Sequence, residues 1–238
     1  MKILILGATS SIGKSISKGF AKNNQLFLLS TKIAELKSLK KEVIHLGAID
    51  TKIISLNLGH HLNINKFIDD PVDMIINIAS ATSRLKNSEI NPHHNQLYTS
   101  VDLSNPLIFL EHFLEKGVKK DKDYQLYYIF INTILSKIQS PDYSIYYSYK
   151  ILQQEYMRIF QRKYNNNLKT INAIVGKTID KSIENKKTIN LVNRIHLAIK
   201  KDESEFIFGF EGKLINTLYS ISPLLSNTII YLKRFLLK

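Results

Sequence analysis

Residues 1–14 read MKILILGATSSIGK and join an unbroken apolar run to a turn that begins and ends with glycine. Gly7 follows the apolar run directly, and Gly13 lies six positions further on, where a helical period has begun. Such a turn brings backbone N–H groups and the positive end of a helix dipole toward an anion such as a pyrophosphate. The segment therefore predicts a buried strand over residues 2–6, a helix over residues 11–22, and a phosphate-binding turn between them.

Short apolar runs continue to alternate with longer helical periods, which indicates β-α units that feed a parallel sheet. Further strands are predicted over residues 25–30, 52–56, 74–78, 126–132, 170–175 and 205–208. Further helices are predicted over residues 33–41, 63–68, 143–164 and 188–201, with a pair over 91–119 and a last one over much of 214–236, interrupted by Pro223. We expect an α/β fold, a doubly wound parallel sheet in three layers of the Rossmann type, with a ligand crevice outside the carboxyl ends of the strands.

The composition is that of a globular protein. The chain has 238 residues, of which 44% are hydrophobic and 22% charged, and these values exclude a mainly disordered chain. We expect one nucleotide-binding domain over residues 1–238, with residues 212–238 as an amphipathic helical tail within it. The absence of cysteine excludes a disulfide scaffold, a thiolate zinc site, an iron–sulfur cluster and a cysteine nucleophile, and it fits a reducing compartment such as the cytoplasm.

Basic residues outnumber acidic ones by 33 to 20, which gives a formal net charge of +13. Lysine, asparagine and isoleucine, which A/T-rich codons specify, are abundant together, so codon bias explains much of this charge. No nucleic-acid-binding motif accompanies it, and we expect no nucleic-acid partner. Polar residues interrupt the apolar region 214–237 too often for a membrane-spanning helix. The adjacent pairs His60-His61 and His93-His94 point in different directions on a regular element, so no metal site is predicted.

Tyr146 and Lys150 are four positions apart within a predicted helix and therefore share one face of it. A tyrosine with an unperturbed pKa near ~10 is a poor acid–base catalyst at neutral pH, and a neighbouring ammonium favours its phenolate form. Lowering this pKa toward the working pH is what general acid–base catalysis requires. The hydroxyl of Thr133 follows the predicted strand 126–132, thirteen residues before Tyr146.

These motifs, in this order along residues 1–180, resemble the short-chain dehydrogenase/reductase family. The turn of the first fourteen residues resembles the family's Gly-x-x-x-Gly-x-Gly loop, with Ser11 in place of the middle glycine, and the strand end Asn77-Ile-Ala-Ser resembles its Asn-Asn-Ala-Gly motif. The resemblance implies that a nicotinamide transfers hydride while Tyr146 exchanges a proton with the substrate oxygen. Lys150 would lower the pKa of that tyrosine and bind the nicotinamide ribose. Thr133 would hydrogen-bond the reacting oxygen, and Ser136 is the alternative for this role.

The resemblance also implies a set of cofactor-binding residues. They are Gly7, Thr9, Ser10, Ser11, Ile12, Gly13, Thr31, Lys32, Asn57, Asn77, Ala79, Tyr146, Lys150 and Val175. The second strand ends at Thr31 and Lys32 without a carboxylate, and hydroxyls with a lysine suit the 2′-phosphate of NADP. NADP is therefore favoured, with NAD as the alternative. Val175 stands where the family has a proline whose turn meets the nicotinamide amide.

Asp102 aligns with a family asparagine but lacks its amide donor. Either this departure disturbs the family's proton relay through lysine and water, or the aspartate is a buried ion-pairing or capping residue. The function that the resemblance implies is an NAD(P)-dependent oxidoreductase that interconverts a ketone and a secondary alcohol. One alternative is a catalytically weak NADP-binding regulatory protein of the same fold. Another is a nucleotide-sugar epimerase or dehydratase, although little chain remains after the sixth strand for the substrate region of such enzymes.

Substrate choice depends on the residues after Gly176, where the family places its lid. Residues 177–187 are polar and basic, which fits either an anionic substrate or a solvated loop. The tail 214–238 combines apolar residues with basic ones, and similar tails occur in family members that reduce lipid-linked sugars. One hypothesis is therefore a polyprenyl- or glycan-related substrate with peripheral membrane contact through the tail. Packing of the tail against the domain or a second subunit is the favoured interpretation. A homo-oligomer is also expected.

Overall fold

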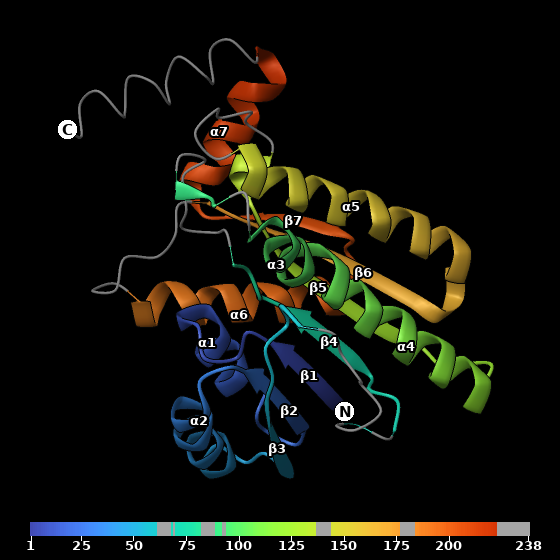
Figure 1. Ribbon diagram of the computed structural model, residues 1–238. Coiled ribbons are helices and arrows are strands. Elements are labelled where there is room, and N and C mark those ends of the chain that lie inside the picture. The colour runs from blue at the N-terminus through green and yellow to red at the C-terminus, as the bar shows by residue number, and fades with distance from the viewer. Residues whose placement is uncertain are drawn as a thin grey trace.

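The computed structural model describes residues 1–60, 68, 70–81, 89–91, 94–136, 144–176 and 184–222. Its strands form one sheet in the order β3-β2-β1-β4-β5-β6-β7, and each neighbouring pair is parallel (Figure 1). The strands are β1 (Lys2–Leu6), β2 (Gln25–Ser30), β3 (Asp50–Ser55), β4 (Met74–Asn77), β5 (Leu126–Thr133), β6 (Leu168–Val175) and β7 (Glu205–Phe208). The doubly wound parallel sheet expected from the sequence is confirmed.

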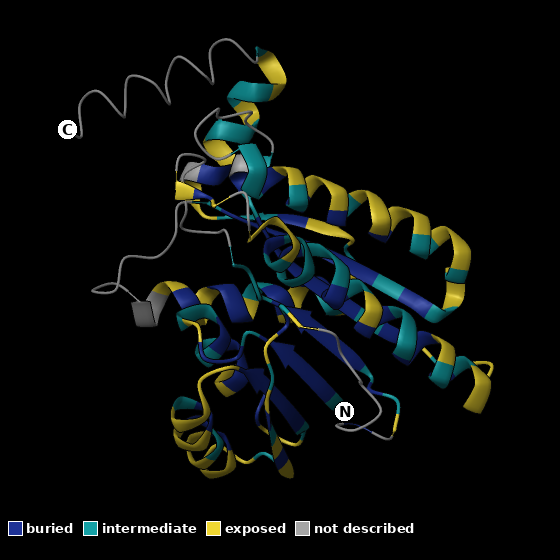
Figure 2. Ribbon diagram, viewed as in Figure 1, coloured by how far each residue is buried: buried dark blue, intermediate teal, exposed yellow. Residues whose placement is uncertain are grey.

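Helices cover both faces of the sheet. They are α1 (Ser11–Gly19), α2 (Ile33–His45), α3 (Asn95–Thr99), the π-helical turn η4 (Ser100–Ser104), α4 (Asn105–Lys120), the 3-10 turn η5 (Ile134–Ser136), α5 (Ser144–Tyr164), the 3-10 turn η7 (Asn165–Asn167), α6 (Glu184–Lys200) and α7 (Phe210–Ile221). One apolar core joins Ile16 of α1 and Leu191 of α6 to the sheet, and a second core on the opposite face contains Phe109 of α4 and Met157 of α5. The central strands are therefore buried from both sides (Figure 2), which explains their continuous apolar runs.

The strands match the predictions within two residues at each end, and the helices differ more. Helix α1 ends at Gly19 instead of residue 22, because the chain turns at Asn23, whose φ is +61°. The predicted helix pair over 91–119 is divided into α3, η4 and α4, and the last helix begins at Phe210 instead of residue 214. Most of the predicted helix over 63–68, and all of the tail beyond residue 222, lie outside the described residues.

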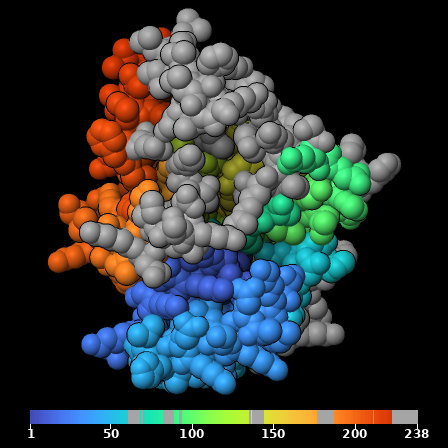
Figure 3. Space-filling model, turned by 90° about the vertical axis from the view of Figure 1, so that its left-hand side faces the viewer, coloured from blue at the N-terminus to red at the C-terminus, as the bar shows by residue number. Residues whose placement is uncertain are grey.

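The connections on the two sides of β1 position the site. β1 pairs with β2 on one side and with β4 on the other, so the strand order reverses at this point of the sheet. In doubly wound folds, ligands bind at the carboxyl edge of such a switch point. Figure 3 views the molecule from this edge, with the blue β1–α2 region below and the green residues around α3 above it to the right.

Candidate active site

The turn between β1 and α1 is ordered by its own hydrogen bonds. Gly7 has φ +86°, a conformation that favours glycine, and its N–H donates to the carbonyl of Leu29 at 3.0 Å. The hydroxyl of Ser10 donates to the Gly7 carbonyl at 2.9 Å and accepts the N–H of Gly13 at 3.0 Å, which caps α1. The N–H groups of Ser11 and Ile12 precede the first intrahelical bond, so they are the donors that a bound anion would meet.

Both predicted glycines stand where the backbone has no room for a side chain. A Cβ atom at Gly13 would lie 2.3 Å from the carbonyl oxygen of Gly7. A Cβ atom at Gly7 would lie 3.0 Å from the backbone nitrogen of Ala79, just after β4. The loops after β1 and β4 are therefore in close contact, and this brings Gly7, Gly13 and Ala79 together as the sequence predicted.

Two of the predicted cofactor residues beside β2 have partners within the protein. The hydroxyl of Thr9 is buried and lies 2.5 Å from that of Ser30. The Nζ atom of Lys32 is 2.9 Å from one carboxylate oxygen of Glu35, and Nζ of Lys14 is 2.6 Å from the other. Hydrogen bonds first from Lys14 and then from Lys32 lower the pKa of Glu35. Sequence reasoning missed Lys14 and Glu35, although the charge of Lys14 directly after the glycine turn was a signal for the first of them.

The remaining two adenosine-side residues, Thr31 and Asn57, are exposed at the same edge. Thr31 directly follows β2. Asn57 lies two residues beyond β3, and its side-chain oxygen accepts the N–H of Gly59 at 2.9 Å. This bond orders the turn after β3.

Asn77, at the end of β4, is completely buried and belongs to a polar network under the site. Its Nδ2 donates to the hydroxyl of Tyr128 at 3.1 Å, and its Oδ1 accepts the N–H of Ala79 at 3.2 Å. Gln153 of α5, also fully buried, donates to the same hydroxyl at 3.4 Å. The network connects β4, β5 and α5, and Tyr128 and Gln153 are two members of it that sequence reasoning missed.

Tyr146 and Lys150 occupy successive turns of α5, as predicted. Lys150 is 1% exposed, and its Nζ atom lies 5.9 Å from the centroid of the Tyr146 ring. Burial lowers the pKa of Lys150, while the charge of Asp102 acts in the opposite direction. A lysine is seldom buried in this way without a function or a partner of opposite charge.

The expected lowering of the Tyr146 pKa is wrong. Burial, and next the negative charge of Asp102, raise the pKa of this phenol above its ordinary value. Both causes favour the neutral form, because an apolar environment and a neighbouring anion each oppose a phenolate. Sequence spacing identified the pair of side chains but not the depth at which α5 places them. At neutral pH, Tyr146 therefore holds its proton.

Thr133 is the last residue of β5 and is partly exposed at the carboxyl edge. It pairs in register with Val175, the last residue of β6, so both predicted residues lie at the same height in the sheet. The hydroxyl of Ser136, the alternative candidate, donates to the Thr133 carbonyl at 2.7 Å. Next to it, Asn132 is buried, and its Nδ2 atom has no hydrogen-bond partner within the described part of the chain.

Asp102 lies in the π-helical turn η4 and is fully buried. One carboxylate oxygen accepts the N–H of Ala81 at 3.0 Å, so the aspartate orders the chain just after β4. π-Helical turns are rare and occur frequently at functional sites. The aspartate is buried, as the ion-pairing or capping interpretation requires, and η4 packs against α5.

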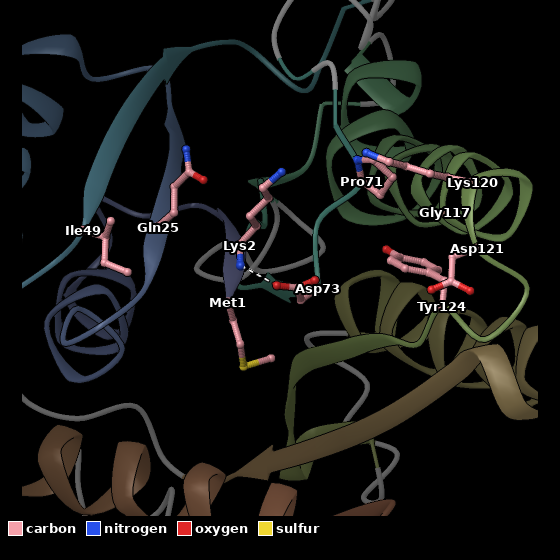
Figure 4. Close-up of a pocket in the computed structure, with 10 residues that line it drawn as sticks. All are labelled: Met1, Lys2, Gln25, Ile49, Pro71, Asp73, Gly117, Lys120, Asp121 and Tyr124. Atoms are coloured by element: carbon pink, nitrogen blue, oxygen red, sulfur yellow. Dashed lines mark hydrogen bonds between the residues drawn. The ribbon is translucent and has the colours of Figure 1, made fainter.

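One cavity among the described residues lies away from this edge. It has a volume of about 430 Å³ and lies at the amino ends of the strands, opposite the carboxyl edge (Figure 4). Lys2 and Asp73 face it, joined by a 2.6 Å bond from the Lys2 N–H, and Lys2 and Lys120 are both paired with Asp70. We assign the functional site to the carboxyl edge and not to this cavity, because the buried titratable residues Asp102 and Lys150 lie toward that edge. Residues 137–143 and 177–183, which include most of the predicted lid, lie outside the described residues.

The described residues contain no group of three or more histidine, cysteine, aspartate or glutamate side chains that could hold a metal ion. Within the same part of the chain, no helix is long and apolar enough to span a membrane. The predicted histidine pairs are only partly described: His60 and His94 are exposed, and their partners in sequence fall outside.

Several solved structures share this fold over most of the chain. The bulky-bulky ketone specific alcohol dehydrogenase from Comamonas testosteroni has a TM-score of 0.75 at 13% identity, with 87% of this chain and 85% of that chain covered. A short-chain dehydrogenase from Sphingobium yanoikuyae in complex with NADPH has a TM-score of 0.75 at 14% identity and 87% coverage of both chains. FolM alternative dihydrofolate reductase 1 from Brucella suis in complex with NADP has 0.74 at 14% identity, over 89% of this chain and 93% of that one.

At these identities, the similarity establishes the fold, which is that of short-chain dehydrogenase/reductase structures. No family model matches the sequence, and no curated protein matches it.

Proposed function

We propose that this protein is an NAD(P)-dependent oxidoreductase of the short-chain dehydrogenase/reductase type that interconverts a ketone and a secondary alcohol. The observation that carries the proposal is the pair formed by Tyr146 and the buried Lys150 on the helix that follows β5. The fold is shared with an NADPH-bound short-chain dehydrogenase and an NADP-bound alternative dihydrofolate reductase. A buried lysine one turn from a phenol has a clear use in acid–base chemistry.

The residues at the carboxyl edge fit a dinucleotide. Gly7 and Gly13 have no side chain, so a ligand can approach the backbone of the first turn closely. The N–H groups of Ser11 and Ile12 would hold the pyrophosphate. Ala79 lies against Gly7, and Val175 is the last residue of β6 at the same carboxyl edge of the sheet. These two residues would therefore line the path toward the nicotinamide. When bound, a reduced nicotinamide supplies hydride to a carbonyl carbon.

The chain's own residues would supply the proton and the orientation. In the reductive direction, the Tyr146 hydroxyl donates its proton to the carbonyl oxygen that becomes the alcohol. The Thr133 hydroxyl donates a hydrogen bond to the same oxygen and opposes rotation of the substrate. The ammonium of Lys150 stabilises the phenolate that Tyr146 becomes after proton transfer. In the oxidative direction, the same phenolate accepts the proton of the alcohol.

NADP is the cofactor that the charges favour. Lys14 and Lys32 converge on Glu35 beside the end of β2, where the adenosine ribose would lie, and the described end of that strand carries no carboxylate of its own. A 2′-phosphate arriving there would take both lysines as partners, since a phosphate carries more charge than one carboxylate. The ribose 2′-hydroxyl of NAD carries no charge, so it would not form ion pairs with these lysines.

The finer proposals concern substrate, membrane and assembly. Helix α7 exposes Phe210 and Ile221, and it leads into the basic, apolar tail, which supports a lipid-linked or sugar-related substrate and contact with a membrane surface. Deleting residues 222–238 should then reduce binding to anionic liposomes, and unchanged binding would reject this part.

Helix α5 exposes Leu152 and Ile159, which supports a homo-oligomer. Light scattering of the purified protein tests that expectation.

The activity itself is tested by following NADPH oxidation with a panel of aliphatic, aromatic and bulky ketones, and NADP⁺ reduction with the matching alcohols. We expect turnover with at least one ketone, and a loss of about a hundredfold or more in Tyr146→Phe with NADPH affinity retained. Tyr149→Phe is the matched control. Tyr149 lies three positions after Tyr146 on α5, and its hydroxyl is 3.1 Å from that of Thr99 on α3. NADPH binding without any turnover would favour the regulatory alternative over an enzyme.

A further inference from the structure

Two charged side chains of opposite sign are buried together beside Tyr146. Asp102 has no exposed surface and Lys150 is 1% exposed, and the turn η4 that carries the aspartate packs against α5, which carries the lysine. Isolated charges are rarely found at such depth, because removing either from water costs several kcal/mol.

The backbone holds Asp102 where it can act on both neighbours. The N–H of Ala81 donates to one of its carboxylate oxygens at 3.0 Å, and the π-helical turn places the residue toward the sheet instead of toward solvent. Within the described residues, the titratable groups on which its charge acts are Tyr146 and Lys150, both from α5. Tyr149 of the same helix lies near the preceding α3, where its hydroxyl is 3.1 Å from that of Thr99.

We propose that Asp102 is the built-in counter-charge of the Lys150 ammonium, which it keeps cationic inside the protein, and that it keeps the phenol of Tyr146 protonated, so that the site is set to donate a proton. The second half of this proposal rests on the proposed function, whereas the first half concerns the folded chain alone. Asp102 is therefore a positioning residue that acts through Lys150 and Tyr146.

The direction of each electrostatic effect agrees with this role. The charge of Asp102 raises the pKa of Lys150 against the opposite effect of burial, and it adds to burial in raising the pKa of Tyr146. An asparagine at this position would keep a hydrogen-bond acceptor for Ala81 but would remove both effects. Lys150 would then be a buried cation without a counter-charge and would lose its proton at a lower pH.

The test is a stability cycle with Asp102→Asn, Lys150→Met and the double variant, measured by urea unfolding from pH 6 to pH 10. We expect each single variant to lower the unfolding midpoint at pH 7, because it leaves one buried charge without the other. The double variant should recover most of the loss, since neutral groups of similar volume replace both charges. In Asp102→Asn, the free energy of unfolding should rise with pH over a range that extends to lower pH than in the wild type. The reason is that a further lowered Lys150 pKa makes the unfolded state bind more protons in that range.

Asp73→Asn is the matched control, because Asp73 also accepts a backbone N–H, that of Lys2 at 2.6 Å, at the opposite edge of the sheet. Additive effects of Asp102→Asn and Lys150→Met, or a pH dependence in Asp102→Asn no different from that of the control, would overturn the proposal. These measurements need no substrate, so they stand even if no oxidoreductase activity is found. If activity is found, Asp102→Asn should shift the alkaline decline of carbonyl reduction to lower pH, and an unshifted decline would overturn the part that concerns Tyr146.

Discussion

The Nζ atom of Lys150 lies 5.9 Å from the centroid of the Tyr146 ring, and the two side chains belong to successive turns of α5. The lysine is within range to stabilise a phenolate, yet burial and Asp102 hold the pKa of the phenol above its ordinary value. The site therefore contains a protonated acid beside a cation that can stabilise the anion it becomes after donating its proton.

The raised Tyr146 pKa predicts different pH profiles for the two directions of the reaction. Carbonyl reduction needs the protonated phenol, so its kcat/KM should be flat from pH 6 through the neutral range and decline only at alkaline pH. Alcohol oxidation needs the phenolate, so its kcat/KM should rise with pH throughout this range, by about tenfold per pH unit while the phenol is mostly protonated. Initial rates in both directions between pH 6 and pH 10 check this. A decline of reduction already between pH 6 and pH 8 would contradict it.

The ion pairs of Glu35 predict how the cofactor preference changes. Lys14→Ala and Lys32→Ala should each weaken NADPH binding by about tenfold, a typical loss for one phosphate contact, and should leave NADH binding nearly unchanged. Glu35→Gln should strengthen NADPH binding, because the two lysines no longer have a competing carboxylate. Fluorescence titration with both nucleotides measures these affinities, with Lys18→Ala, whose partner is Glu42, as the control. Equal effects on NADPH and NADH would contradict the assignment.

Gly13→Ala should destabilise the protein and impair nucleotide binding together. The new Cβ would lie 2.3 Å from the Gly7 carbonyl oxygen, so the turn after β1 must move. Overpacking of this kind costs about 1–3 kcal/mol in the free energy of unfolding. Thermal unfolding with and without NADPH measures both effects. Ser15→Ala, on the next turn of α1, should change neither quantity by a comparable amount, and a Gly13→Ala protein that binds NADPH normally would refute the role of the turn.

Tyr128→Phe should lower stability without touching the reacting groups. Loss of this hydroxyl leaves the buried donors of Asn77 and Gln153 without their acceptor, at a cost of about 1–3 kcal/mol. Urea unfolding measures the change. Tyr156→Phe is the control, because the side chain of Tyr156, on α5, is 43% exposed. A Tyr128→Phe protein as stable as the control would show that water replaces the lost hydroxyl.

Local pattern was sufficient to predict most of the fold. The strands were identified within two residues because a strand buried on both faces must be apolar along its length, and this property belongs to a short stretch of sequence. Gly7 and Gly13 were identified for a similar reason, since a tight turn between a strand and a helix depends on the backbone of a few residues. Tyr146 and Lys150 were recognised because a spacing of four places two side chains on one helix face.

The charges of the site depended on the tertiary structure. The pairing of Lys14 with Glu35 requires α1 and α2 to lie side by side, whereas Lys32 and Glu35 are only three positions apart in the chain. The burial of Asp102 requires the π-helical turn to pack against α5, and the raised pKa of Tyr146 follows from that packing. A sequence determines which groups are titratable and how neighbouring residues share a face. Only packing between distant segments decides which groups lose water and which charges meet, and these two quantities set the protonation of the site.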